Sequence, residues 1–203
     1  MDSTHLPANQ DEWRTRIRTH LLQSADLKRR TADERLDSIV SAANTIVDCY
    51  RSMNKVLICG NGGSAADSQH MAAEFMNRLS DQFERPGLPA IALTTDTSFI
   101  TSYSNDIGFD RVFERQVLAL GNAGDVLLTI TTSGKSPNVV KAVEAARLRN
   151  MKTIALTGEG GSIIELVDCP ITVPSSNTQF VQECFLSIEH AVCDVVEQML
   201  FAS

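Results

Sequence analysis

Two short loops rich in glycine and hydroxyl residues are the segments of this sequence best suited to hold a phosphate. The first is residues 60–64 (GNGGS), and the second is residues 131–136 (TTSGKS). Each directly precedes a predicted helix, whose first backbone N–H groups point towards an anion. One such turn alone is more often an ordinary helix cap. Two of them, each after a predicted strand, favour a phosphate site built from both loops.

The overall charge limits how such an anion is bound. The chain has 203 residues and a formal net charge of −7, so it would repel an anionic metabolite at long range. Ser and Thr hydroxyls and helix dipoles can bind phosphate without extra positive charge, which suits a neutral sugar phosphate. The same charge argues against nonspecific nucleic-acid binding, because no surplus of Lys and Arg is present to release counterions.

Four side chains on two predicted helices form a second candidate group. His70 and Glu74 are four residues apart and therefore share one helix face. The final helix carries Gln182 and His190. Together they offer a mixed nitrogen and oxygen set for zinc or a similar divalent ion, although a lone His190 is more often a core histidine. The Gln182–His190 spacing corresponds to ~12 Å of helix rise, so a shared metal must lie between them.

The elements that must position these residues follow from the apolar pattern. Five short runs rich in branched residues alternate with helical stretches, which is typical of a parallel sheet covered by helices on both faces. We predict a three-layer αβα fold with a five-stranded, flavodoxin-like parallel sheet and a long C-terminal helix. The predicted strands are 55–59, 89–93, 125–131, 152–157 and 170–173, and the predicted helices are 65–79, 110–120, 137–150, 162–166 and 178–201.

Two further helices are predicted before the first strand. Trp13, Ile17 and Leu21 recur every four residues in one, and apolar residues between 36 and 50 mark the other. A Thr31–Glu34 capping box would start the second. We therefore predict a single domain over 1–203, with an N-terminal helical arm (1–52) available for subunit packing and an α/β core (53–203). The stripe predicted to face the core on the final helix comprises Val181, Phe185, Ile188, Val192, Val195 and Met199.

The cysteines and the terminal segment bear on the cellular compartment. The five cysteines have no regular spacing, which is typical of reduced, buried thiols. The polar, acidic N-terminus does not resemble a secretory signal, and no apolar run approaches the ~20 residues needed to cross a bilayer. We expect a cytoplasmic protein without membrane attachment.

The first loop also matches the dinucleotide-binding pattern G-x-G-x-x-A over residues 60–65. A nicotinamide site would need an acidic residue at the end of the second strand, where Thr94 and Thr95 stand instead and Asp96 comes too late. The pattern is weak on its own, so we expect no nucleotide cofactor. We expect the same loop to enter its helix through a Ser64–Asp67 capping box.

Four segments in order resemble the motifs of bacterial phosphoheptose isomerases, within the wider group of sugar isomerase (SIS) domains. They are GNGGSAADSQHMAAE, LTTDTS, TTSGKSPNV and QECFLSIEH, and they extend over nearly the whole chain. The sequence departs slightly from the family pattern: Thr131 stands where Ser is common, and Lys135 where Asn is frequent.

The resemblance implies interconversion of sedoheptulose 7-phosphate and D-glycero-D-manno-heptose 7-phosphate, the first step of nucleotide-activated heptose biosynthesis. It implies a homotetramer with active sites at subunit contacts and one Zn²⁺ per subunit, bound by His70, Glu74, Gln182 and His190. The residues expected to bind substrate are Asn61, Gly62, Gly63, Ser64, Glu74, Thr95, Asp96, Thr131, Thr132, Ser133, Ser136 and Gln182.

Aldose–ketose isomerisation through an enediol needs a base near the substrate carbons and an acid for the neighbouring oxygen. Glu74 is the candidate base, and His190 the partner acid or second base. The alternative is a non-catalytic SIS-domain protein that binds a phosphosugar or a replication initiator. The initiator-binding relative has a small residue at the position of Glu74 and Asn at that of His190. The presence of both reactive groups favours the enzyme.

Overall fold

Five parallel strands form the centre of the protein in a computed structural model, which describes residues 9–79, 81 and 84–202. The strands are β1 (Val56–Gly60), β2 (Ala90–Ala92), β3 (Val126–Thr131), β4 (Lys152–Gly158) and β5 (Cys169–Val173), in the spatial order β2-β1-β3-β4-β5. All four pairings are parallel. Every residue of β1 and β3 is buried, as continuous apolar runs require. The predicted sheet and its flavodoxin-like order are confirmed.

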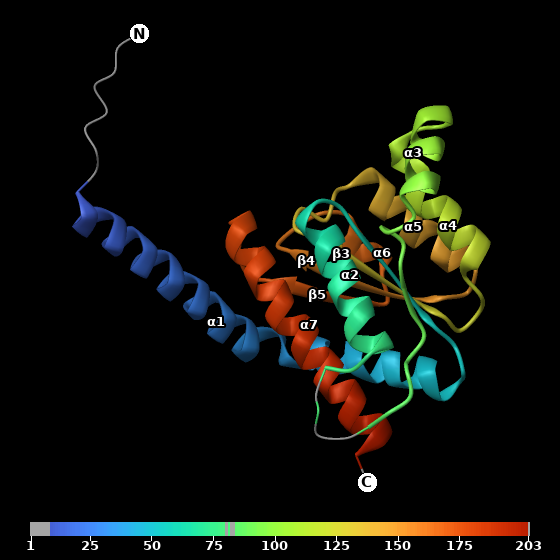
Figure 1. Cartoon of the computed structure of the whole chain (residues 1–203), viewed down its shortest axis with the longest axis horizontal. Coiled ribbons are helices and arrows are strands. Elements are labelled where there is room, and N and C mark those ends of the chain that lie inside the picture. The colour runs from blue at the N-terminus through green and yellow to red at the C-terminus, as the bar shows by residue number, and fades with distance from the viewer. Residues whose placement is uncertain (1–8, 80, 82–83, 203) are drawn as a thin grey trace.

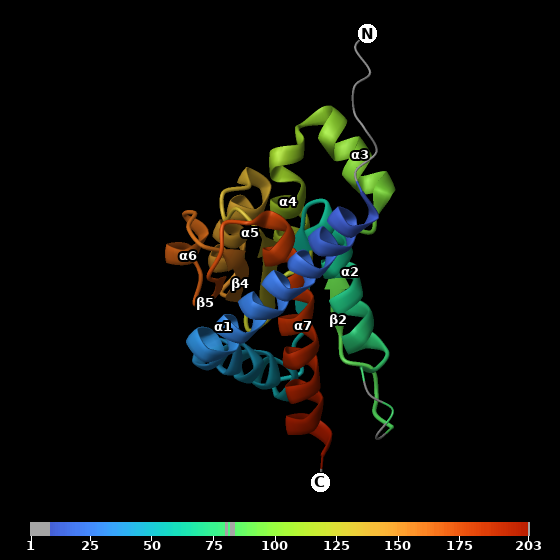
Figure 2. The same ribbon diagram turned by 90° about the vertical axis from the view of Figure 1, so that its left-hand side faces the viewer.

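Helices cover both faces of this sheet, which confirms the three-layer prediction (Figures 1 and 2). The face with the larger buried cluster carries α1 (Gln10–Arg51), α2 (Gly63–Met76) and α7 (Thr178–Phe201). The other face carries α4 (Val112–Leu120), α5 (Pro137–Leu148) and α6 (Ile163–Leu166). A 3-10 turn (Phe109–Arg111) precedes α4, and α3 (Thr97–Asp106) follows the second strand. The sequence pattern did not predict α3, which buries no residue fully and so has no core stripe.

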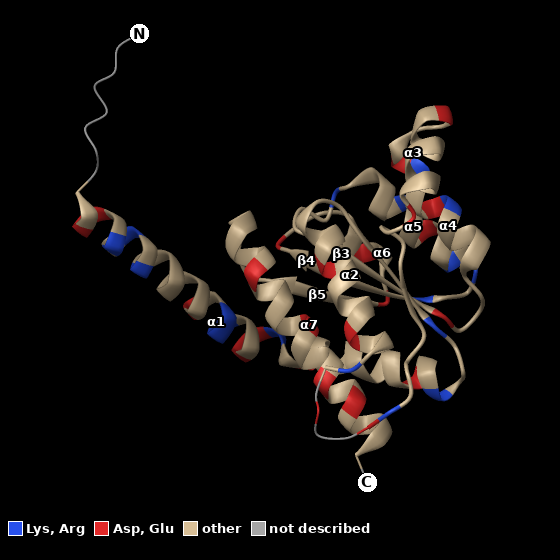
Figure 3. Cartoon of the chain, in the orientation of Figure 1, with Lys and Arg blue, Asp and Glu red and all other residues tan. Residues whose placement is uncertain are grey.

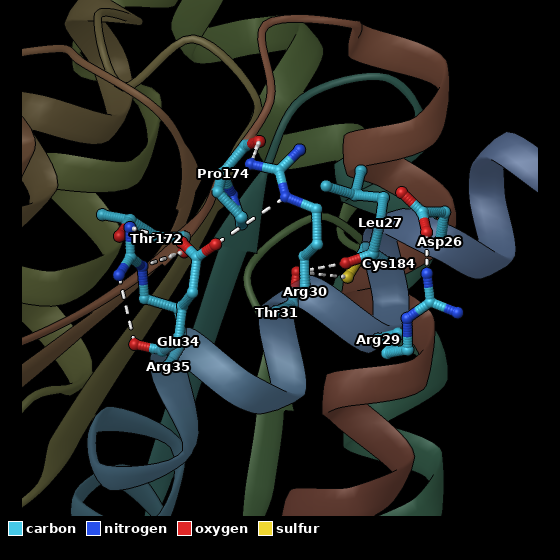
Figure 4. Close-up of polar contacts among 10 residues, drawn as sticks. All are labelled: Asp26, Leu27, Arg29, Arg30, Thr31, Glu34, Arg35, Thr172, Pro174 and Cys184. Carbon is cyan, nitrogen blue, oxygen red and sulfur yellow. Dashed lines mark hydrogen bonds and ion pairs between the residues drawn. The ribbon is translucent and has the colours of Figure 1, made fainter.

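The predicted division of the N-terminal arm into two helices is wrong, because α1 is one helix of 42 residues. Thr31 lies inside it, and its hydroxyl donates to the Leu27 carbonyl at 2.9 Å instead of capping a helix start. Arg35 Nε donates to the Thr172 carbonyl at 3.0 Å and Arg30 to that of Pro174 at 3.3 Å, which fastens this part of α1 beside β5 (Figure 4). These tertiary contacts therefore stabilise one continuous helix across the predicted break. Residues 1–8 of the predicted arm lie outside the described residues.

The amino-terminal half of α1 projects from the body of the molecule (Figures 1 and 2). Its apolar residues Trp13, Ile17 and Leu21 are 49%, 63% and 63% exposed. Lys and Arg as well as Asp and Glu lie along this helix (Figure 3). An apolar stripe that finds no core within its own chain is consistent with an arm that packs on another subunit.

The final helix departs from its predicted core stripe at its end. Val195 and Met199 are 38% and 40% exposed, whereas Val196 is buried. The first four predicted positions are buried as expected. All five cysteines are free and buried, which confirms the prediction of reduced core thiols. None of the helices in the described part of the chain has the length and apolarity to span a membrane.

Candidate active site

The two glycine- and hydroxyl-rich loops leave the sheet side by side. Strands β1 and β3 are neighbours, with Gly60 paired to Ile130, so both loops emerge at the carboxyl edge, where the strand order reverses. Asn61 and Asn138 join them through two reciprocal amide hydrogen bonds of 2.9 Å each. Asn138 is 3% exposed. The pair holds the first loop against the start of α5, and Asn138 was missed in the sequence because a single Asn in a helix gives no local signal.

Helix α2 begins at the first loop without a side-chain cap. Its N-cap is Gly62, whose φ of 58° favours glycine. The predicted Ser64–Asp67 capping box is therefore wrong. The Ser64 hydroxyl instead lies 3.3 Å from Gln182 Oε1, and Asp67 accepts a hydrogen bond from the Gln182 amide. Both side chains face α7, which leaves the start of α2 to a ligand.

The second loop is shaped by its own hydroxyls. The Thr131 hydroxyl accepts from the Gly134 N–H at 3.3 Å, and the Ser133 hydroxyl from the Lys135 N–H at 3.2 Å. Gly134 has φ 63°, and a Cβ there would approach the Gly160 carbonyl oxygen to 2.6 Å. Ser133 is exposed, while Thr132 and Ser136 are partly exposed. Helix α5 then starts with Pro137 and no side-chain cap, so a second helix N-terminus lies at this edge.

The end of β2 contributes the predicted residues Thr95 and Asp96. The Asp96 carboxylate accepts from the Phe99 N–H at 2.9 Å and so caps α3, while the Thr95 hydroxyl donates to the Ala92 carbonyl at 3.1 Å. Both residues are exposed. A cavity of about 160 Å³ lies between the first loop and the segment that follows α3; its lining includes Asn61, Gly62, Thr94, Ile100, Phe109 and Phe113.

The predicted reactive side chains meet where α2 runs beside α7 (Figure 1). His70 Nε2 and His190 Nε2 are 2.8 Å apart, so one ring donates a hydrogen bond and the other accepts it. Glu74 Oε1 lies 3.7 Å from His70 Nε2. The Glu74 side chain is 19% exposed and that of His70 is 41% exposed. The structure therefore brings His70, Glu74 and His190 together, although their sequence positions span 120 residues.

Gln182 lies apart from these three side chains. It is held by Ser64 and Asp67 in the first turns of α2, while His190 contacts His70 further along the helix. In the parts of the chain that the structure describes, no three His, Cys, Asp or Glu side chains are arranged as a metal-binding group. The donor chemistry of the two histidines and Glu74 fits zinc, whereas a contribution from Gln182 would require it to leave Asp67.

Glu189 is a buried carboxyl that sequence reasoning missed. It precedes His190 on α7, is 1% exposed, and neither of its oxygens has a hydrogen-bond partner among the described residues. Burial, aided by the nearby charge of Asp67, raises the pKa of Glu189 to about 8. Burial also raises the pKa of Asp67, although the hydrogen bond from Gln182 opposes this. The seam between α2 and α7 therefore disfavours further negative charge.

Comparison with known proteins shows the family of this chain. The SIS domain family model matches residues 20–158. The phosphoheptose isomerase of Roseiflexus sp. (strain RS-1) is 51% identical over 179 residues, which cover 88% of this chain and 90% of that protein. Among solved structures, the phosphoheptose isomerase of Neisseria gonorrhoeae is 43% identical with a TM-score of 0.86, covering 92% of this chain and 99% of that one.

A second solved structure agrees. The phosphoheptose isomerase of Francisella tularensis is 42% identical with a TM-score of 0.87, covering 91% of this chain and 97% of that one. Each of these three matches covers at least 88% of this chain and at least 90% of the other protein. This chain belongs to the SIS-domain proteins and, among them, to the phosphoheptose isomerase family.

Proposed function

We propose that this chain interconverts sedoheptulose 7-phosphate and D-glycero-D-manno-heptose 7-phosphate, the first step of nucleotide-activated heptose biosynthesis. The observation that carries the proposal is the convergence of Glu74, His70 and His190 on the seam that starts at the phosphate-type loops. His70 lies seven residues beyond Gly63, or ~10 Å of helix rise. A seven-carbon sugar whose reacting carbons lie at the end opposite its phosphate suits that separation.

Each group of residues has its own task in this proposal. The backbone of residues 61–63 and the hydroxyls of Thr132, Ser133 and Ser136 bind the phosphate and the sugar, helped by two uncapped helix N-termini. The other predicted contacts lie around them. Ser64 is at the start of α2, where Gln182 of α7 contacts it, and Thr95 and Asp96 follow β2.

The proton transfer is assigned to the two reactive side chains. Glu74 removes the proton from the carbon next to the carbonyl and returns it to the neighbouring carbon of the enediol. His190 exchanges a proton with the adjacent oxygen. Partial burial of Glu74 limits its hydration, which favours proton transfer over exchange with solvent.

We also propose that His70, His190 and Glu74 bind one Zn²⁺, with Gln182 joining if its contact with Asp67 opens. When bound, the metal would polarise the substrate carbonyl as a Lewis acid. Elemental analysis of the purified protein, before and after treatment with a chelator, tests this. One zinc per chain, lost in a His70→Ala variant, supports the site; the same metal content in that variant contradicts it.

The proposal extends to assembly and location. The exposed apolar residues of α1 support a homotetramer in which the arm packs on a second copy. Five free, buried cysteines support the reducing cytoplasm. Light scattering of the purified protein tests the assembly, and a monomeric mass at assay concentrations would contradict it.

The decisive experiment is an NMR assay with sedoheptulose 7-phosphate. We expect signals of the heptose product to grow in the presence of the wild-type protein. Because base and acid are both required, Glu74→Gln and His190→Ala should each abolish turnover while the protein stays folded by circular dichroism. Absence of turnover by the wild type, with retained binding of the sugar phosphate, would favour a non-catalytic binding protein.

A further inference from the structure

A buried ion pair joins Arg85, in the segment between α2 and β2, to Glu197 on α7. Arg85 Nη2 lies 2.5 Å and Nε 2.8 Å from Glu197 Oε1. The two side chains are 0% and 1% exposed. Helix α7 carries four acidic residues and neither Lys nor Arg. Because charges are costly to bury, such a pair persists only where its remaining donors and acceptors are also used.

Arg85 Nη1 donates to the carbonyl of the adjacent Pro86 at 3.0 Å, and further hydrogen bonds of the pair go to the backbone around the end of α2. Arg85 Nη2 donates to the Glu74 carbonyl at 2.8 Å, and Nη1 to the carbonyl of Phe75 at 2.9 Å. Glu197 Oε1 accepts from the Leu79 N–H at 2.8 Å. A guanidinium at this position satisfies carbonyls that have no partner within the helix and lies at the negative end of its dipole.

The same pair connects the two candidate proton-transfer residues. Its guanidinium is bonded to the backbone of Glu74 itself. Its carboxylate stands on α7 seven residues, or about two helical turns, after His190. The side-chain hydrogen bonds described between α2 and α7 themselves lie earlier along the two helices, at Ser64, Asp67 and His70.

From this geometry we infer that Arg85 and Glu197, named here the Arg85–Glu197 clamp, are positioning residues that set Glu74 relative to His190. The inference rests on the proposed function, because it assigns Glu74 the role of base. The planar, forked guanidinium of Arg85 bonds two carbonyls of α2 and the Glu197 carboxylate at once. The ammonium of a lysine could not form these bonds in one plane, so the positioning role requires arginine. Loss of the fork lets the last turn of α2 shift, and the base moves with it.

The first test is Arg85→Lys, which keeps the charge and removes the fork. We expect kcat for the sugar phosphate to fall about 10- to 100-fold while KM changes less than about threefold, because the phosphate loops are untouched. A purely structural role would lower the melting temperature without separating kcat from KM. An unchanged kcat in folded Arg85→Lys protein would overturn the inference.

A double variant separates positioning from stability. Replacing both partners with methionine removes the buried charges together, and such replacements often recover stability. We expect Arg85→Met/Glu197→Met to regain much of the melting temperature lost by Arg85→Met alone while kcat stays low. If kcat instead recovers in step with the melting temperature, the clamp serves stability only and the inference fails.

The Lys55–Asp125 pair provides the matched control. Lys55 Nζ lies 2.6 Å from Asp125 Oδ2, and the Asp125 side chain is 1% exposed, but the pair stands at the amino ends of β1 and β3. Lys55→Met should lower the melting temperature and leave kcat within about twofold. A kcat loss equal to that of Arg85→Lys would contradict a specific positioning role. Failure of the proposed function is distinct, because then the wild-type protein itself would show no turnover in the NMR assay, whatever the clamp variants do.

Discussion

The loop region and the α2–α7 seam of this site are held in place by different means. The loops follow β1 and β3, whose parallel pairing from Val56–Val126 to Gly60–Ile130 brings them to one edge. The seam brings together polar and charged side chains that are more than 100 residues apart in the sequence, through the contacts His70–His190 and Asp67–Gln182 and the Arg85–Glu197 clamp. Backbone pairing therefore positions the residues proposed to bind substrate, while side-chain pairing positions those proposed to react with it.

This difference predicts how each region responds to substitution. A hydroxyl removed from a loop leaves the sheet and the other loop donors in place, so its effect should be local and small. A charged or hydrogen-bonded group removed from the seam leaves a buried partner unsatisfied or removes the chemistry itself. Substitutions in the seam should therefore have the larger effects.

The largest effect is expected from Glu74→Gln. The amide cannot accept the substrate proton, so kcat should fall about 10³-fold, within the range for loss of a general base. The partly exposed side chain should cost little stability. Rates from the NMR assay and melting curves would be compared with Glu144→Gln, the same change at an exposed position on α5. A kcat within tenfold of the wild type would remove Glu74 as the base.

The next effect concerns stability and its pH dependence at Glu189. The folded state holds the proton up to about pH 8, whereas the ordinary pKa is 4.5, so rising pH between these values destabilises the fold. Glu189→Gln removes this cost, and at pH 8 it should stabilise the protein by on the order of 2 kcal/mol. The gain should vanish near pH 5.

Thermal or urea unfolding at pH 5 and pH 8 measures the Glu189 effect. Glu144→Gln again serves as control, because its exposed carboxyl should give the same small change at both pH values. An equal stability difference for Glu189→Gln at the two pH values would show that the buried carboxyl does not titrate as described.

In the loop region, Ser133→Ala should weaken binding of the sugar phosphate by about 1–2 kcal/mol, the value of one hydrogen bond. The melting temperature should change little, because Ser133 is exposed and water can replace its hydroxyl as the acceptor of the Lys135 N–H. Calorimetric titration would measure the affinity, with Ser52→Ala at the end of α1 as a control distant from the loops. Unchanged affinity would place the phosphate elsewhere.

The smallest effect is expected for Lys135→Gln. Lys135 is exposed in the second loop, so its charge is screened and should contribute less than about 1 kcal/mol to phosphate binding at physiological salt. Affinity at low and high salt would reveal this contribution as a difference that disappears with added salt. A tenfold loss at high salt would instead indicate a direct contact with the phosphate.

The strands and most helices could be predicted because their signals are local. The apolar runs of β1 and β3 exclude solvent-facing alternatives, and Pro137 marks the first residue of α5. The phosphate-type loops were predictable for the same reason, since their glycines and hydroxyls follow those strands directly. Helix α3 escaped because it buries nothing, and the break predicted at Thr31 was wrong because tertiary contacts override a local capping pattern.

By itself the sequence determined the sheet and the two loops, since these depend on residue type and short-range periodicity, whereas the reactive roles of Glu74 and His190 stay a prediction based on the family resemblance. Only the tertiary structure decided which side chains meet: that Gln182 is held by Asp67 while His70 takes His190, that Glu189 is buried, and that Arg85 holds the backbone of Glu74. The physical reason is that these pairings join helices separated by long stretches of chain, where packing and the cost of burying charge select the partner.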